Sequence, residues 1–115
     1  MRARLDAERL DRLFFALSDA HRRDMLQRLG AGPASVSELA EPLGLALPSA
    51  VKHLAVLEQG GFVASTKTGR VRTYEVDPAA FDAMQAWVER HKALLQAQFD
   101  RLDAYLVQQK AKARR

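Results

Sequence analysis

The order of patterns between Ser37 and Tyr74 is the feature that most constrains what this chain folds into. Ser37 carries a hydroxyl that suits the start of a helix, so a helix is expected to begin at Glu38 and to end at Gly44. Pro42 lies inside this stretch and has no backbone N–H to donate, so it should kink or shorten the helix.

A second helix is predicted directly after this glycine. Apolar residues recur there at steps of three and four, which places them on one helical face: Leu47, Ala50, Leu54 and Leu57. Pro48 suits the first turn of a helix, where a missing N–H costs nothing. The helix is expected to run from Leu47 to Gln59 and to end at Gly60 and Gly61, which supply a left-handed stop. One face then lies in the core and the other is free.

A basic hairpin is predicted after the second helix. Residues 62–67 are rich in side chains that suit a strand, residues 68–70 form a turn around Gly69, and residues 71–76 return. Two helices joined across a glycine turn and followed by a hairpin form a winged helix-turn-helix, whose second helix enters the major groove of DNA. The predicted fold class is therefore mainly α with a small β-hairpin wing.

At this point the chain resembles a known family, the ArsR family of bacterial winged-helix regulators. The residues that carry the resemblance are LSDAHRR (17–23), VSELAEPL (36–43), LP (47–48), KHL (52–54), VLE (56–58) and GR (69–70). They cover roughly residues 10–78, and the C-terminal part matches less specifically. LP together with KHL and the tail FDRLDAYL is similar to members without metal ligands. The resemblance implies a dimeric DNA-binding regulator, most often a repressor.

Two positions depart from the family pattern. Val51 stands where relatives tend to carry a serine, and Ala55 stands where they often carry a basic residue. A valine can meet a thymine methyl group but cannot donate a hydrogen bond. Base contacts are therefore not transferred from the family at Val51.

Charge is distributed unevenly along the chain. The 115 residues hold 18 lysines and arginines and 14 acidic residues, a surplus that is compatible with a polyanion partner. Residues 37–59 carry three glutamates against the single Lys52 and are net negative. The positive charge that frames the two helices comes from clusters before them, in the wing and at the chain's end: Arg22, Arg23, Arg28, Lys67, Arg70, Arg72, Lys110, Lys112, Arg114 and Arg115. Phosphate attraction is therefore assigned mainly to the wing and to the arginines that precede the two helices.

Contacts with double-stranded DNA are expected from the second helix and the wing: Pro48, Ser49, Val51, Lys52, His53, Lys67, Arg70 and Arg72. Arg70 is the strongest single candidate, because a tip arginine after a glycine can follow the DNA backbone or enter the minor groove. His53 is either a direct contact or a local hydrogen-bonding group. Arg22 is assigned equally to a phosphate contact and to a structural role that caps or bridges helices.

The two ends of the chain predict how two copies pair. Asp77 can cap a helix with Pro78 at its first position, and apolar or amphipathic residues follow at alternating steps of three and four. A helix over 78–109 is about 48 Å long, more than a domain of this size covers by itself. The expected dimer interface combines both terminal helices: Leu10, Phe14, Met84, Trp87, Val88, His91, Leu95, Leu102 and Tyr105. The alternative is that the long helix folds back over its own monomer or breaks near its middle.

Several classes of protein are excluded from the sequence. There is no cysteine, so disulfides and thiolate metal sites are absent. Glu38 and Glu41 alone do not make a metal site, and Asp82, His91 and Asp103 are too far apart on one helix to share an ion. We therefore expect no metal and no cofactor. No nucleophile, phosphate loop or acid–base pair indicates an enzyme.

The overall prediction is one winged helix-turn-helix domain over residues 1–109, with a basic flexible tail over 110–115. No apolar run approaches the roughly 20 residues that cross a bilayer, and the N-terminus lacks the apolar stretch of a signal peptide, so a cytoplasmic protein without a membrane partner is expected. The predicted function is a homodimeric repressor of its own operon that does not respond to metal, with a small-molecule or protein effector left open. The alternative is a winged-helix protein-interaction module without specific DNA binding, which accounts for the negative two-helix segment but not for the basic wing.

Overall fold

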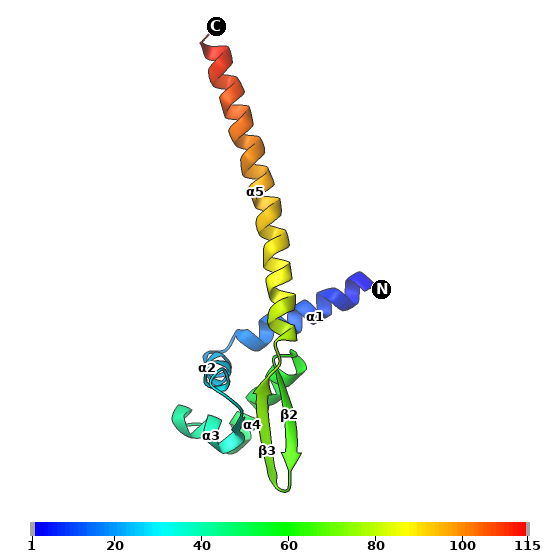
Figure 1. Ribbon diagram of the computed structural model, residues 1–115, viewed down its shortest axis with the longest axis vertical. Helices are drawn as coiled ribbons and strands as arrows, with labels where there is room; N and C mark the ends of the chain where they lie inside the picture. Colours follow the sequence, from blue (N-terminus) through cyan, green and yellow to red (C-terminus); the bar gives the residue numbers. More distant parts are fainter. Residues whose placement is uncertain (1, 115) are drawn as a thin grey trace. The chain divides into compact units, whose positions relative to one another are not determined.

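The computed structural model describes residues 2–114 and divides into two compact units, one up to Asp82 and the other from Ala83 onward. The chain forms, in order, α1 (Arg2–Leu17), α2 (Ala20–Leu29), β1 (Ala34–Ser35), α3 (Val36–Ala40), a 3₁₀ turn (Glu41–Leu43), α4 (Leu47–Gln59), β2 (Val63–Thr68), β3 (Val71–Val76) and α5 (Ala79–Ala113) (Figure 1). The predicted fold class, mainly α with a β-hairpin wing, is confirmed. A single winged helix-turn-helix domain over residues 1–109 stays a prediction. The residues beyond Asp82 form one helix, which makes its backbone hydrogen bonds within itself.

α3 begins at Val36, and its N-cap is Ser35 rather than the predicted Ser37. The Ser35 hydroxyl accepts a hydrogen bond from the Glu38 N–H at 3.3 Å, and the Glu38 carboxylate accepts one from the Ser35 N–H at 3.1 Å. These two bonds form a capping box, which satisfies free N–H groups at the start of the helix. Ser35 is the cap because it has a glutamate three residues later. Ser37 lies inside the helix and is exposed.

The shortening predicted at Pro42 is confirmed. α3 ends at Ala40, and Pro42 lies in the first turn of the following 3₁₀ turn. Gly44 closes that turn with φ 65°, a left-handed conformation that glycine adopts without a steric penalty. The chain then enters α4.

α4 has the predicted bounds, Leu47 to Gln59, with Pro48 in its first turn. Ala50, Leu54 and Leu57 are fully buried, whereas Leu47 at the first position is 52% exposed. The apolar stripe therefore covers the core from the second turn onward, and Leu47 extends beyond the packed part of this face. The left-handed stop falls on Gly61, with φ 81°, while Gly60 keeps a right-handed conformation.

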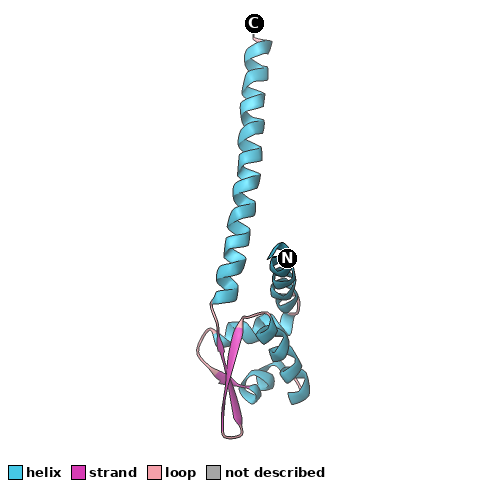
Figure 2. Ribbon diagram, turned by 90° about the vertical axis from the view of Figure 1, so that its right-hand side faces the viewer, coloured by secondary structure: helices cyan, strands magenta, loops and turns pink. Residues whose placement is uncertain are grey.

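The wing is an antiparallel hairpin in which Thr68 pairs with Val71 across the turn formed by Gly69 and Arg70 (Figure 2). Gly69 has φ 63°, as the first position of a tight two-residue hairpin turn requires. β1 adds a third strand on the other side of β3, so the sheet order is β1-β3-β2. This two-residue strand was not predicted, because it is too short to show an alternating pattern.

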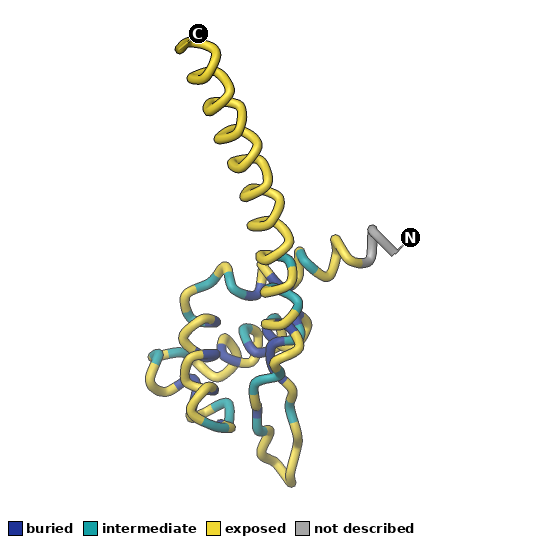
Figure 3. Tube along the Cα trace, turned by 45° about the horizontal axis from the view of Figure 1, so that its top comes forward, coloured by how far each residue is buried: buried dark blue, intermediate teal, exposed yellow. Residues whose placement is uncertain are grey.

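The core of the first unit lies between α1, α2, α3, α4 and the sheet, as the buried segments in Figure 3 show. The largest fully buried side chains are Leu13, Met25, Leu39, Leu54, Leu57 and Phe62. Phe62 also meets Phe81 edge to face, with ring centroids 4.9 Å apart. Phe62 was expected at the start of β2 but lies just before it, where its ring packs into this core.

The closest approach between α1 and α4 involves a glycine. A Cβ atom at Gly60 would lie 3.0 Å from the Ala16 Cβ and 3.2 Å from the Arg12 carbonyl oxygen. Because one of these neighbours is backbone, it has little freedom to give way. Gly60 is therefore required by the packing of α1 against the end of α4.

α5 begins at Ala79, one residue after the predicted start at Pro78, and the Asp77 carboxylate accepts a hydrogen bond from the Ala79 N–H at 3.0 Å. The helix continues to Ala113, past the predicted end at residue 109, so that Lys110 and Lys112 of the expected basic tail are helical. Lys110 and Lys112 lie in its last turn, where cations favour the helix dipole. None of the helices within residues 2–114 is long and apolar enough to span a bilayer.

We predict that Gly60→Ala destabilises the first unit by about 1–3 kcal/mol, because the added methyl group overpacks the contact between α1 and α4. This corresponds to a fall in melting temperature of roughly 4–8 °C for each kcal/mol. Gly30→Ala is the matched control, since Gly30 is exposed, has φ −60° and meets only carbonyls of its own helix. Thermal unfolding of the two variants measures the effect, and equal melting temperatures would contradict the packing role.

Candidate nucleic-acid interface

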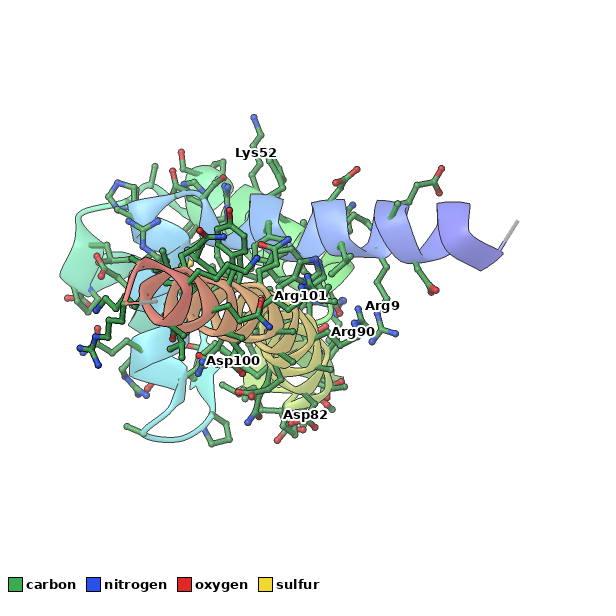
Figure 4. The ribbon with its side chains drawn as sticks, turned by 90° about the horizontal axis from the view of Figure 1, so that it is seen from above. Arg9, Lys52, Asp82, Arg90, Asp100 and Arg101 are labelled. Atoms are coloured by element: carbon green, nitrogen blue, oxygen red, sulfur yellow. The ribbon has the colours of Figure 1, made fainter. Side chains whose placement is uncertain are left out.

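The free face of α4 is polar at its start and carries one cation. Pro48, Ser49, Val51 and Lys52 are exposed, with Val51 at 47%. Figure 4 shows Lys52 extending away from the helix. These side chains project opposite to the buried Ala50, Leu54 and Leu57, so α4 presents a surface that is free to enter a groove.

The wing carries three exposed cations at and near its tip. Arg70 lies in the two-residue turn, and Lys67 pairs with Arg72 on the adjacent strand. A hollow of about 250 Å³ lies between the wing and the start of α3, lined by Ser35, Val36, Ser37, Arg70, Val71 and Arg72. Guanidinium groups and hydroxyls are the donors that bind phosphate oxygens in DNA complexes.

A chain of hydrogen bonds joins the wing to the end of α4. Arg72 Nη1 donates to the Ser65 hydroxyl at 2.9 Å, and that hydroxyl donates to Glu58 Oε1 at 3.0 Å. Burial of Tyr74 and the nearby Glu58 raise the pKa of the Tyr74 hydroxyl, while Arg72 opposes this rise. Arg72 is thus partly occupied within the wing, although its side chain is exposed.

Arg22 is buried, in contrast to the wing arginines, with 7% exposure. Its guanidinium donates to the Ala16 carbonyl at 2.7 Å and to the Phe15 carbonyl at 2.9 Å, and it lies 5.0 Å from the centre of the Phe15 ring. Nη1 lies 3.2 Å from His53 Nδ1. These contacts agree with the structural alternative for Arg22, because its donors face carbonyls and a ring inside the fold rather than the surface.

The same cluster includes Asp19, the N-cap of α2. Its carboxylate accepts a hydrogen bond from the Arg22 N–H at 3.2 Å and lies 3.9 Å from His53 Nδ1. Burial alone would raise the pKa of Asp19, but the Arg22 N–H and the charges of His53 and Arg22 outweigh it and lower the pKa below 3.8. The His53 side chain thus extends from α4 to the junction of α1 and α2.

Comparison with known proteins identifies this arrangement. The sequence pattern of a helix-turn-helix domain family matches residues 17–66. The chain is 36% identical over 80 residues to the HTH-type transcriptional regulator Rv2034 of Mycobacterium tuberculosis, covering 70% of this chain and 75% of that protein. A crystal structure of an ArsR family transcriptional regulator is 44% identical with a TM-score of 0.75, and the match covers 78% of this chain and 93% of the other. The chain belongs to the ArsR family.

Two further proteins are similar at lower identity. The transcriptional repressor SdpR of Bacillus subtilis is 25% identical over 79 residues, which cover 69% of this chain and 88% of SdpR. A homodimeric winged helix-turn-helix DNA-binding domain, Mb0332 of Mycobacterium bovis, is 25% identical with a TM-score of 0.63, and the match covers 81% of this chain and 87% of the other. As an ArsR-family protein, this chain is a transcriptional regulator with a helix-turn-helix DNA-binding domain and not an enzyme.

Glu38, one of the acidic residues considered as a metal ligand in this ArsR-family chain, has other partners. Glu38 accepts hydrogen bonds in the capping box and lies 3.8 Å from Arg28 Nη2. The Ser35 backbone N–H is the main cause that lowers the pKa of Glu38, and the Ser35 hydroxyl and Arg28 add to it. Among residues 2–114, no group of three His, Asp or Glu side chains lies close enough to hold a metal ion.

The predicted dimer-interface residues of this ArsR-family chain fall on α1 and α5. Leu10, Met84 and Trp87 are half-buried, and the others are exposed: Phe14, Val88, His91, Leu95, Leu102 and Tyr105. The Trp87 and His91 rings stack with centroids 3.9 Å apart, and His91 Nδ1 lies 2.8 Å from the Trp87 carbonyl oxygen. Since a carbonyl only accepts, Nδ1 donates in this contact.

Sequence reasoning missed three residues at the interface: Ser35, Glu58 and Ser65. Ser35 had a visible signal, because a serine followed three residues later by a glutamate is a capping box. The bond between Glu58 and Ser65 had none, since it depends on how the hairpin folds back against α4.

We predict that the charge of Asp19 adds stability near pH 7 that is lost in acid. Because the pKa of Asp19 is lower in the folded state, this stability is present above the ordinary value of 3.8 and disappears as the pH falls through the lowered pKa. Asp19→Asn keeps an N-cap but removes the charge. Denaturation of both proteins from pH 7 down to pH 3 should show a difference at neutral pH that closes below about pH 4. A constant difference would contradict the charge effect.

Proposed function

We propose that this protein is a homodimeric repressor that binds an imperfectly palindromic operator near its own promoter. The observation that carries the proposal is the exposed face of α4 beside a wing with Arg70 at its tip. SdpR, a transcriptional repressor, and the homodimeric DNA-binding domain from Mycobacterium bovis support repression and pairing. Because its target is DNA, we expect the protein to act in the cytoplasm.

The DNA contacts are assigned to exposed positions of α4 and the wing, together with the partly exposed His53: Pro48, Ser49, Val51, Lys52, His53, Lys67 and Arg70. α4 lies in the major groove in this proposal, with half-sites about one helical turn apart or a multiple of it. Arg70 and Arg72 hold phosphates beside the hollow at the start of α3, although Arg72 must share its guanidinium with Ser65. Arg22 contacts α4 through His53 on the side that faces the core, and it makes no DNA contact in this proposal.

Pairing of two copies is assigned to the exposed apolar residues of α5. They are too many for a helix that stays in water: Val88, Leu94, Leu95, Phe99, Leu102, Tyr105, Leu106 and Val107 are each 39–66% exposed. The seam from Met84 to Tyr105 advances by alternating steps of four and three, the spacing of helices that pair side by side. A second copy of the same helix supplies a matching seam.

Release from DNA is assigned to a small-molecule or protein effector rather than to a metal ion. The chain contains no cysteine, and the glutamate at the start of α3 is engaged in the capping box. Thiolates are the ligands through which soft metal ions are usually bound. Addition of zinc or cadmium should therefore leave DNA affinity unchanged.

The first test is binding to a duplex from the region upstream of its own gene, over a salt series, beside a scrambled duplex. We predict that Arg70→Ala lowers affinity about tenfold and makes the salt dependence shallower by about one counterion, because one phosphate contact is lost. Arg9→Ala is the control, since Arg9 is an exposed cation on α1. If no complex prefers the upstream duplex to the scrambled one even at low salt, the result supports the protein-interaction module instead, with Val51 and Ala55 as its docking surface.

A second prediction concerns the seam of α5. Leu95→Glu should convert the dimer to a monomer, because a carboxylate in an apolar seam is desolvated without a partner. Ala97→Glu adds the same charge about 200° around the helix and should leave the dimer intact. Sedimentation equilibrium of the two variants measures this. Dimers in both variants would exclude α5 as the pairing surface.

A further inference from the structure

The His53 ring lies against the Arg22 guanidinium, a group that can only donate hydrogen bonds. Its side chain is 21% exposed, and its Nδ1 lies 3.2 Å from Arg22 Nη1, within hydrogen-bonding distance. Asp19 Oδ1 lies 3.9 Å from the same nitrogen, beyond that distance. His21 approaches ring to ring at 5.8 Å.

These distances decide which ring nitrogen carries the proton. An arginine guanidinium has no acceptor and does not lose its proton in proteins, so the nitrogen that faces it must accept. Nδ1 is therefore unprotonated, and the neutral ring carries its hydrogen on Nε2. The arginine is itself fixed, because its other N–H groups donate to the carbonyls of Ala16 and Phe15 and to the Ser18 hydroxyl.

The second ring nitrogen is not fully buried. Among the described residues, no buried side-chain nitrogen or oxygen lacks a hydrogen-bond partner. His53 makes its side-chain hydrogen bond through Nδ1 alone. Nε2 must therefore be accessible, on the same helix as the exposed Ser49, which lies one turn earlier and so on the same side of α4.

We propose that buried Arg22 sets the tautomer of His53, so that Nε2–H is a fixed hydrogen-bond donor to an acceptor on DNA. This inference rests on the proposed function, since it names the chemistry of one contact on the same surface. The acceptor is a phosphate oxygen or a purine N7 or O6 atom in the major groove. Arg22 is then a positioning residue that acts on DNA through His53, which links its burial to recognition.

The tautomer is measured first, on the protein without DNA. Nitrogen chemical shifts of the imidazole rings, with His53 assigned through His53→Gln, should show an unprotonated Nδ1 and a protonated Nε2 at neutral pH. Asp19→Asn is the control and should leave this pattern unchanged, because Asp19 lies outside hydrogen-bonding distance of the ring. A proton on Nδ1 would overturn the proposal whatever the protein does on DNA.

The Nε2–H donor is then tested with two substitutions, one that replaces the donor at Nε2 and one that replaces only the acceptor at Nδ1. His53→Gln places an amide N–H near the position of Nε2, whereas His53→Asn keeps an acceptor toward Arg22 but is too short to reach outward. We expect His53→Asn to lower affinity roughly three- to thirty-fold and His53→Gln to stay within about threefold of the unchanged protein. The probe is a duplex selected from a random pool by the unchanged protein, with a scrambled duplex beside it.

The outcomes distinguish a failure of the proposed Nε2–H contact from a failure of the proposed function. A loss in His53→Asn on the selected duplex alone indicates a base edge, and an equal loss on both duplexes indicates a phosphate; either supports the donor. Equal affinity of both variants and the unchanged protein, or an equal loss in both variants with unchanged melting temperatures, would overturn it. If the unchanged protein selects no duplex, the proposed function fails, while the tautomer result still stands on the nitrogen spectra.

Discussion

The junction between α1 and α2 holds the DNA-binding unit together through the cationic groups of Arg22 and Arg23. The last carbonyls of a helix have no partner within it, and those at the end of α1 belong to Phe15, Ala16 and Leu17. Arg22 donates to the first two, and Arg23 donates to Leu17 at 2.7 Å. Positive charge at a helix C-terminus also favours its dipole. Because Arg22 reaches His53 as well, one guanidinium joins three helices.

Residues 17–23, which carry part of the resemblance to the ArsR family, make the contacts at this junction. In residues 17–23, Asp19 caps α2, while Arg22 and Arg23 close α1 from the following helix. The segment thus carries both the end of one helix and the start of the next. Replacing Arg22 by a lysine would keep the charge but not the fork of donors that meets two carbonyls and a ring together.

The sequence predictions were accurate where a residue acts on its own backbone and less accurate where the structure depends on contacts between distant residues. The bounds of α4 were predicted correctly and the hairpin turn to within one residue, because Pro48, Gly61 and Gly69 act on their own backbone. The start of α3 was placed two residues late, since Ser35 and Ser37 both suit a cap until Glu38 is considered. β1 and the bond from Ser65 to Glu58 depend on contacts between distant residues, which a local pattern does not contain. The DNA-contact residues and the dimer seam remain predictions, although the exposure of α4, the wing and α5 is the condition that both require.

Gly60, at the end of α4, places the backbone of α4 directly against α1. Side chains at a helix crossing usually change rotamer when one helix shifts, and so they absorb the motion. A Cβ atom at Gly60 would lie 3.0 Å from the Ala16 Cβ and 3.2 Å from the Arg12 carbonyl oxygen, and neither of these atoms moves when a side chain changes rotamer. A shift of α1 at this point is therefore expected to carry the end of α4 with it. An effector that moved α1 would then change the position of α4 without touching it.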